Sequence, residues 1–338
     1  MLKMKGLHTD IKVVHVVVSL TMLFVFIWIP AHVLSTSIFV IQGLAQVSPL
    51  LIPGIIVAAW ITASGLSTKA TALFSESNIL ILLMTAAVGA LTPVCGVTVL
   101  PLMASLLGSG VPLYLIMAFW LSSPITDPAM FSVTAATLGI NFAIGKMVGA
   151  FFLGIFGGVV TMCFSKRPWA ISSLRDNAVV GGLGNNSCES ATTFYPAIWR
   201  DEDRKTLFKK EVYVITRLVL LCLIPAFAAE YALNGVLQPQ AVSAYVGPDT
   251  WWAIPVAVLV GGPAYINGYA ALPLTRALLD NGMSVGAAMA FLISGGAVSI
   301  WGAMAIFPVL KVKPFLLYIT LAMTGSLIMG WLFGLFMR

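Results

Sequence analysis

Two acidic residues stand inside or beside long apolar stretches, where a carboxylate could carry a proton or contact a cation. Asp127 follows Pro124 and Thr126 in a segment that interrupts an apolar run, and Glu230 lies near the end of another. Carboxylates inside membrane segments are costly and are functional by default. Asp127 could instead cap the helix that follows it, and Glu230 could lie at the membrane interface. We predict both as coupling residues, with Asp127 the first candidate.

Small and polar residues next to prolines and glycines form a second group of candidates. They fall in four segments, 92–96, 122–127, 263–268 and 294–299, that interrupt apolar runs. Backbone groups freed there must pair within the protein or face a wet cavity, and half-helix ends can hold ions or polar solutes. The predicted substrate-binding residues are Thr92, Pro93, Cys95, Gly96, Ser122, Ser123, Thr126, Asn267, Gly268, Ser294 and Ser299.

Cysteine chemistry is limited to one candidate position. Cys95 lies in the first interruption and could supply a thiolate or a soft-metal contact, although a single buried cysteine can also be a small apolar residue. Asn267 occupies the equivalent place in the third interruption. Because the four cysteines are widely spaced and form no CxxC pair, neither a zinc site nor a disulfide framework is indicated. We expect no bound metal and no cofactor.

An internal repeat relates these interruptions. Sliding the sequence by 172 residues places the segment 89–122 on 261–294 with twelve identities in 34 positions and no gap. The matches include Leu100-Pro101-Leu102 on Leu272-Pro273-Leu274, which apolar composition alone would not align. Repeats of this kind recur in secondary transporters. In each copy the two breaks lie about equally far from a hairpin turn, so we expect the four interruptions to converge in mid-membrane.

The composition decides the class of protein that must position these residues. Of 338 residues, 59% are hydrophobic and 9% are charged, and the mean hydropathy is +1.00. Soluble domains carry about 25% charged residues, so no soluble fold of this length could hide so much apolar surface. The expected fold is an all-α polytopic membrane protein of about nine transmembrane helices, with two internal repeats that contain broken helices and helical hairpins.

The expected organisation has four parts. Residues 1–48 form an N-terminal transmembrane helix and connector, 49–164 the first repeat half, 165–211 a polar basic central loop, and 212–338 the second repeat half. We count one leading helix followed by two sets of four helices. Because four crossings separate the two repeats, they are parallel, whereas a further crossing or a re-entrant turn within 178–199 would make them inverted.

The orientation of the chain is left open by its positive charges. The basic central loop favours a cytoplasmic side for that loop. Lysines assigned to short loops, Lys146 among them, fall on the opposite face under the same helix count. The net charge of +6 is explained by such loops and by anionic lipid, so no nucleic-acid partner is indicated. The expected partners are the lipid bilayer and a small-molecule or ionic substrate, with proton coupling and a homo-oligomer left open.

The interrupted segments also carry a family resemblance. The run Thr92-Pro93-Val94-Cys95-Gly96-Val97-Thr98-Val99-Leu100-Pro101, followed by Gly110-Val111-Pro112 and Ala118-Phe119, resembles the predicted-permease family that includes the organoarsenical-efflux permeases. The second repeat, from Gly282 to Gly295-Gly296-Ala297, is similar to the second conserved block of that family. The resemblance covers most of the chain from about Leu50 onward.

This resemblance implies a multi-pass permease of the bacterial inner membrane that exports a small solute such as a metalloid, an organoarsenical or a small anion. Family members commonly carry Cys-Ser-Cys after the Thr-Pro start, which would suit a trivalent arsenical. Here Cys95 is kept, while Gly96 and Val97 replace the serine and the second cysteine. Capture by two thiolates is therefore not carried over.

Three other functions compete with a secondary transporter. Broken helices also build channels, and the polar central loop could dock a soluble partner on a membrane subunit. An enzyme is not expected, because the sequence contains no HExxH, no GxSxG and no paired intramembrane carboxylates. The chain also has no Walker A motif, so we expect an ion gradient rather than ATP to drive transport.

Overall fold

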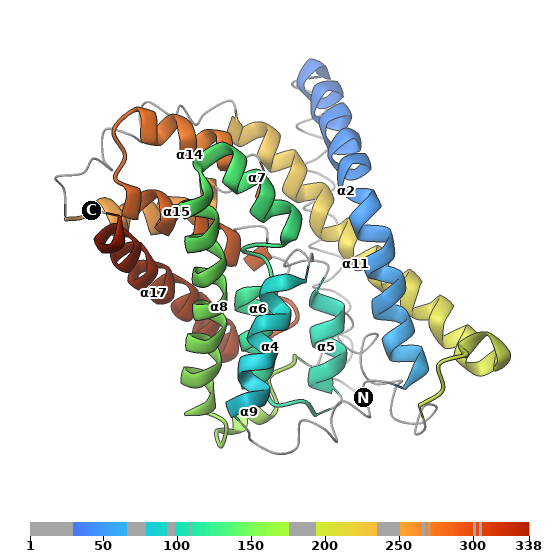
Figure 1. Ribbon diagram of the computed structural model, residues 1–338. Coiled ribbons are helices and arrows are strands. Elements are labelled where there is room, and N and C mark those ends of the chain that lie inside the picture. Colours follow the sequence, from blue (N-terminus) through green and yellow to red (C-terminus); the bar gives the residue numbers. More distant parts are fainter. Residues whose placement is uncertain are drawn as a thin grey trace, which may run out of the picture. The chain divides into compact units, whose positions relative to one another are not determined.

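The described part of the computed structural model consists mainly of α-helices (Figure 1). In the part of the chain that it describes, the only β-type pairing is an isolated bridge between Leu174 and Leu310. The all-α prediction is therefore confirmed for this part. The structure describes residues 30–65, 79–92, 99–108, 110–175, 194–234, 251–264, 268–269, 271–299, 302–303 and 306–337.

The helices of the first half include one that is longer than expected. A single helix, α2, runs through the predicted boundary between 48 and 49 and contains Pro49 and Pro53. Its continuation shows that these prolines do not end the helix. The helices of this half are α2 (Pro30–Ser64), α4 (Ile79–Leu91), α5 (Leu100–Gly108), α6 (Leu113–Ser122), α7 (Pro128–Leu138), α8 (Ile140–Met162) and α9 (Pro168–Ile171).

The helices of the second half begin inside the predicted central loop. Helix α11 starts at Glu202, within the segment 165–211, because Asp201 accepts a hydrogen bond from the backbone N–H of Asp203 at 3.0 Å. Such side-chain caps favour a helix start. The elements of this half are η1 (Ile198–Arg200), α11 (Glu202–Asn234), α13 (Ala253–Ala264), α14 (Ala271–Asp280), α15 (Val285–Ala297) and α17 (Val312–Phe336).

Two of the described helices have the length and hydropathy to cross a membrane. Helix α8 has 23 residues and α17 has 25, with mean hydropathies of 1.9 and 1.7. About 20 residues span the hydrocarbon core. The predicted count of nine spans is not decided by the described residues and stays a prediction.

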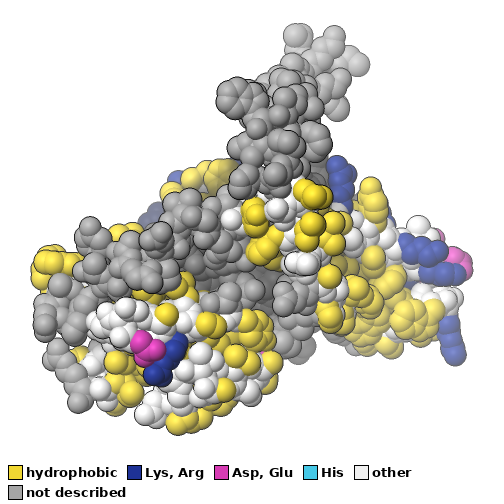
Figure 2. All heavy atoms as spheres, turned by 90° about the horizontal axis from the view of Figure 1, so that it is seen from above, with side chains coloured by type: hydrophobic (Ala, Val, Ile, Leu, Met, Phe, Trp, Pro, Cys, Tyr) yellow, Lys and Arg dark blue, Asp and Glu magenta, His cyan; other side chains and the backbone are white. Residues whose placement is uncertain are grey.

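The exposed faces of these helices are apolar. On α8, Ile140, Ile144 and Val148 are at least half exposed, while Lys146 between them is buried. Figure 2 shows one face of the molecule, on which the described side chains are mostly hydrophobic or uncharged and the charged ones form a few small groups. Apolar side chains outside and a charge inside are the reverse of a soluble helix and suit a lipid environment.

Contacts divide the chain into two units. The first contains Met1–Val47 and Ile224–Val236. Within it, the rings of Phe39 and Tyr231 lie 5.6 Å apart between centroids, and the ring of Phe227 contacts the position of Gly43. The second unit contains the remainder of the chain, including the helices from α4 to α9 and from α13 to α17.

The core of the second unit is formed by α6 and α15. Helix α6 packs against α4 and α8, and α15 packs against α13 and α17 (Figure 1). All residues of α15 except Val285 are buried, and so are all residues of α6 except Phe119. A helix that is apolar all round belongs in a core. Each of these two helices therefore has its own pair of covering helices.

Glycines let the covering helices approach closely. A Cβ added at Gly154 of α8 would lie 2.7 Å from the carbonyl oxygen of Ala118 on α6. A Cβ added at Gly330 of α17 would lie 2.7 Å from the Cβ of Ala290 on α15. Small residues at helix contacts are the usual means of close packing in membranes.

A glycine in the left-handed region reverses the chain before each core helix. Gly110 has a φ of 92° and Gly282 a φ of 93°. The N–H of Gly110 donates to Leu107 O at 3.1 Å, and that of Gly282 donates to Leu279 O at 3.0 Å. Only glycine adopts this backbone without strain. The predicted turns between α5 and α6 and between α14 and α15 are thus present.

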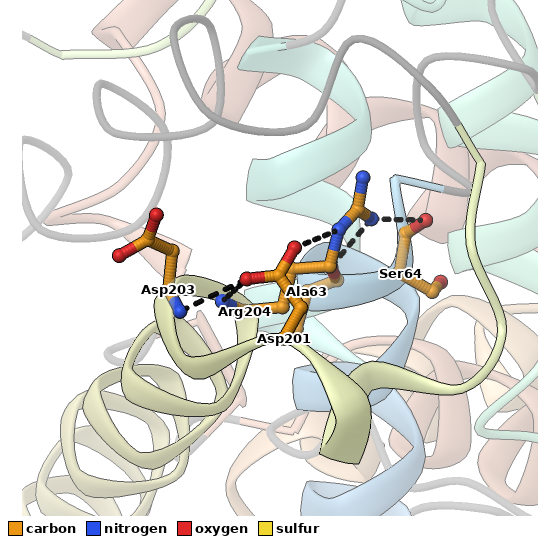
Figure 3. A network of polar contacts seen from close by, with 5 residues as sticks. All are labelled: Ala63, Ser64, Asp201, Asp203 and Arg204. Carbon is orange, nitrogen blue, oxygen red and sulfur yellow. Dashed lines mark hydrogen bonds and ion pairs between the residues drawn. The ribbon is translucent and has the colours of Figure 1, made fainter.

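The first turn of α11 and the segment just before it bind the C-terminal end of α2 (Figure 3). Arg204 is buried, and its Nη1 donates to Ala63 O at 3.3 Å and to Ser64 O at 3.0 Å. Its Nε pairs with Asp201 at 3.3 Å, and Tyr195 N–H also donates to Ser64 O. The last carbonyls of a helix lack intrahelical partners. This part of the basic segment therefore has a structural role.

Candidate functional site

The interruption between α6 and α7 is the best described of the four predicted breaks. Helix α6 ends at Ser122 and α7 begins at Pro128. Pro124 and Pro128 have no N–H to donate, which removes hydrogen bonds from a helical ladder and favours a break in this segment. Asp127 is extended, and its Oδ1 accepts the N–H of Met130 at 2.8 Å. Asp127 therefore caps α7, which is one of its two predicted roles.

Four buried polar atoms at or next to this interruption have no hydrogen-bond partner within the described structure. They belong to side chains that are at most 2% exposed. Buried polar groups are nearly always hydrogen-bonded, because an unpaired one costs roughly 1–3 kcal/mol. A cluster of such groups thus needs an external partner. The atoms are Trp120 Nε1, Ser123 Oγ, Thr126 Oγ1 and Lys146 Nζ.

Helix α8 places Lys146 beside the interruption. Lys146, Ala150, Gly154 and Gly158 follow one another at intervals of four, so they share one helix face. Gly154 and Gly158 contact Ala118 on α6, and Lys146 lies about two turns nearer the N-terminus of α8. There the Asp127 carboxylate interacts with Lys146 electrostatically.

The buried position of Lys146 corrects the sequence-based interpretation. We expect it in a short loop, whereas it lies inside α8 and is 1% exposed. The signal was present, because the apolar run 142–164 already contains this lysine. A charge within a predicted span is itself a functional signal.

The corresponding place in the second half has its polar groups satisfied. Helix α15 ends at Ala297, within the predicted interruption 294–299. The buried Tyr318 of α17 donates its hydroxyl to Ala297 O. Ser299 Oγ accepts the N–H of Gly302 at 3.1 Å, as a capping residue does. The rings of Trp120 and Tyr318 lie 5.6 Å apart between centroids, so the two sets of residues are neighbours.

Ser122 and Ser294 are predicted as ligands, but each bonds to its own helix. Ser122 Oγ donates to the carbonyl oxygens of Ala118 and Phe119, at 2.9 and 3.0 Å. Ser294 Oγ donates to Phe291 O at 3.3 Å. Because these protons are already used, both serines could meet a solute only as acceptors.

The other predicted residues lie apart from this cluster or outside the described residues. The hydroxyl of Thr92 donates to Val88 O at the end of α4, and Gly268 lies in the turn before α14. Glu230 lies within α11. Outside the described residues are Pro93, Cys95, Gly96 and Asn267.

The chemistry of the cluster is that of hydrogen-bond donation. An indole N–H and an ammonium can only donate, and the two hydroxyls can donate or accept. In the described part of the chain, no group of three or more His, Cys, Asp and Glu residues is placed to hold a metal ion. The cluster therefore suits a polar solute that supplies acceptor atoms.

Comparison with known proteins defines the class. The chain belongs to the ArsP_1 family of predicted permeases, whose pattern it matches over residues 32–335. The predicted family resemblance is thus confirmed, and a membrane permease is the function that the family indicates rather than an enzyme.

One curated relative matches a smaller part of the chain. The chain is 31% identical over 142 residues to UPF0718 protein MJ0584 of Methanocaldococcus jannaschii. The match covers 42% of this chain and 39% of that protein. No solved structure matches the chain.

Proposed function

We propose that the protein is a secondary transporter that exports a small solute across the cell membrane in which it is embedded, and that the solute binds at the interruption between α6 and α7. The observation that carries this proposal is the cluster of four buried polar atoms at this interruption that have no hydrogen-bond partner among the described residues. In a membrane, such groups mark a substrate path, because hydrocarbon offers them no compensation.

Two matched halves form part of the proposal. Its support is that a shift of 172 residues relates Gly110 to Gly282, both in left-handed turns, and Gly89 to Gly261. A Cβ at Gly89 would lie 2.1 Å from Ser122 Oγ, and one at Gly261 would lie 2.2 Å from the Oγ of Ser294. Rocking of one half against the other would then give alternating access to a site between the interruptions.

Coupling to a proton gradient is assigned to Asp127 in this proposal. Its carboxylate caps α7 and also acts on Lys146. A change in its protonation would therefore alter both the start of a helix and the charge balance of the cluster. Intramembrane carboxylates carry protons in many transporters.

The proposal is tested by uptake into everted membrane vesicles, with arsenite, methylarsonate, phosphate and acetate as probes. We expect at least one probe to accumulate and Thr126→Val to reduce its uptake by roughly tenfold, the value of one hydrogen bond of 1.4 kcal/mol. Thr320→Val is the matched control, because Thr320 is exposed and donates to its own helix.

Three results would contradict the proposal. If wild-type vesicles accumulate none of the probes, the transport of these solutes is contradicted. If Thr126→Val takes up as much probe as the wild type, the solute does not bind at the interruption between α6 and α7. A current far above carrier turnover would indicate a channel. Cys95→Ala, measured in parallel, separates a thiophilic solute from the others.

A further inference from the structure

We propose that Lys146 is the receptor for a small oxyanion with a single negative charge, which makes the substrate of this permease anionic. The inference rests on the proposed function, since it names the class of solute that binds at the same interruption. It is carried by the burial of Lys146, by its place in α8 and by the donors around it.

The burial of Lys146 is the first step. Its side chain is 1% exposed, and Nζ has no hydrogen-bond partner in the described chain. None of the ion pairs of the described residues includes it. Lysine is almost never fully buried without a partner, and a buried ion without one costs several kcal/mol. The ammonium has three N–H groups and accepts nothing, so its partner must offer acceptor atoms.

The residue that corresponds to Lys146 in the second half shows which part of the structure a side chain at this helix position contacts. Under the shift of 172 residues, Lys146 of α8 corresponds to Tyr318 of α17. The two helices pack alike, because Gly158 contacts Leu82 and Ala118, while Gly330 contacts Ile254 and Ala290, the equivalent pair. These contacts fix the register independently of sequence identity.

From its position, Tyr318 reaches Ala297 O, where α15 ends. Lys146 in the same position of α8 therefore faces the end of α6 and the interruption that follows. There the ammonium makes no comparable bond within the described structure. At this place the second half has the hydrogen-bonded phenol of Tyr318, and the first half has the ammonium of Lys146, which is available to bind a ligand.

The neighbouring groups select an oxyanion. Trp120 Nε1 can only donate, and the hydroxyls of Ser123 and Thr126 donate to no acceptor in the described part of the chain. Together with the ammonium, these donors match a solute that has several acceptor oxygens around one centre. Charge-assisted hydrogen bonds to such an oxyanion are about twice as strong as neutral ones.

Asp127 limits the charge of the solute. Its carboxylate is held on the N–H of Met130 and interacts with Lys146. A bound anion would therefore lie near the negative charge of Asp127. The repulsion between them rises with each negative charge that the anion carries, and it is strong in a low dielectric. This favours a monoanion, such as a carboxylate or a singly ionised oxyacid, over a dianion.

The test measures the thermal unfolding midpoint of the purified protein in detergent at fixed pH and ionic strength. The probes are sodium acetate, phosphate, arsenate and dimethylarsinate, with sodium chloride and choline chloride as references. We expect at least one oxyanion to raise the midpoint of the wild type. In Lys146→Met, the apparent Kd for that anion should rise at least about tenfold, which corresponds to 1.4 kcal/mol.

Two controls secure the result. Lys313→Met removes a lysine from an exposed position of α17 and should leave the shift unchanged. Lys146→Arg keeps the cation and should retain part of the shift. Lys146→Gln is a second neutral variant, for use if the methionine variant does not fold.

The results separate this inference from the proposed function. The inference is overturned if no oxyanion of the panel shifts the wild type, or if the neutral variants respond as the wild type does. Vesicle uptake that does not depend on Lys146 would also overturn the anion receptor, while it would leave the permease standing. An anion shift that requires Lys146, without uptake in vesicles, would support the receptor and contradict the transporter.

Discussion

Helices α8 and α17 of the second unit make similar glycine contacts with α6 and α15 but differ in their polar groups. Tyr318 of α17 donates to Ala297 O, whereas Lys146 at the matching place in α8 has no partner within the described structure. The glycines between the helices, by contrast, make equivalent contacts on both sides. Two similarly packed helices can therefore carry, at matching positions, a buried group with a hydrogen-bond partner and one without such a partner among the described residues.

The caps of the two halves differ in the same way. Asp127 accepts the N–H of Met130, and Ser299 accepts the N–H of Gly302. In both cases the side-chain oxygen accepts the backbone N–H of the residue three positions later, but Asp127 also carries a negative charge. The first half is thus the chemically specialised half in the described structure.

The largest expected effect tests the shared packing. Gly89→Ala and Gly261→Ala would place a Cβ 2.9 and 3.0 Å from the backbone oxygens of Phe119 and Phe291. We expect each to lower the free energy of unfolding by about 1–3 kcal/mol through overpacking. Thermal unfolding in detergent measures this loss.

Gly54→Ala is the control, since a Cβ there meets nothing within 4 Å. It should leave the protein unchanged or stabilise it, because alanine favours a helix over glycine by up to about 1 kcal/mol. Destabilisation by one of the two test variants alone would show that the halves do not pack alike.

The second prediction sharpens the contrast between Tyr318 and Lys146. Tyr318→Phe leaves the buried Ala297 O without its donor and should cost about 1–3 kcal/mol of stability. Lys146→Met removes a buried ammonium that has no hydrogen-bond partner in the described chain, and it should leave the unfolding midpoint equal or higher in the absence of anions, because the desolvation penalty of the ion is lost. A large loss of stability in Lys146→Met would instead mean that the ammonium has a structural role.

The third prediction concerns the two left-handed turns. Gly110→Ala and Gly282→Ala should each cost roughly 1–2 kcal/mol, because a Cβ disfavours this backbone region. A Cβ at either glycine meets nothing within 4 Å, so the cost is that of the backbone alone. Urea unfolding should give similar losses of the free energy of unfolding for the two variants, with unchanged m-values. Clearly unequal losses would show that the two turns are not equivalent.

The smallest effect separates capping from charge. Ser299→Ala should cost about 0.5–2 kcal/mol through loss of its cap. Asp127→Asn keeps a capping oxygen, so its unfolding midpoint should stay close to that of the wild type, while gradient-driven uptake should fall. If Asp127→Asn takes up the solute normally, and this uptake still stops when the proton gradient is collapsed, Asp127 is not the coupling residue.

Local sequence signals predicted several features of the fold. The hairpin turns at Gly110 and Gly282 and the interruption at 122–127 follow from glycine and proline, which act on their own stretch of backbone. The cap at Asp127 is of the same kind. Helix α2 runs through the predicted boundary between 48 and 49 and continues past Pro49 and Pro53 to Ser64. The start of α11 at Glu202 likewise extends a helix into the predicted loop.

The candidate site could be predicted only in part. Ser123, Thr126 and Asp127 were found because they lie in a visible interruption. Lys146 was assigned to a loop, although it stands in an apolar run. The free hydroxyls of Ser123 and Thr126 could not be told from the bonded ones of Ser122 and Ser294, since the difference lies in geometry rather than residue type.

The sequence by itself determined that the chain is helical, apolar and interrupted by glycine and proline at repeated positions, because hydropathy and backbone preference are properties of short segments. The packing of the helices was needed to show that Trp120, Ser123, Thr126 and Lys146 are buried without hydrogen-bond partners among the described residues, and that Tyr318 is buried with one. Hydrogen-bond satisfaction depends on neighbours that are distant in the chain, which come together only when the helices pack.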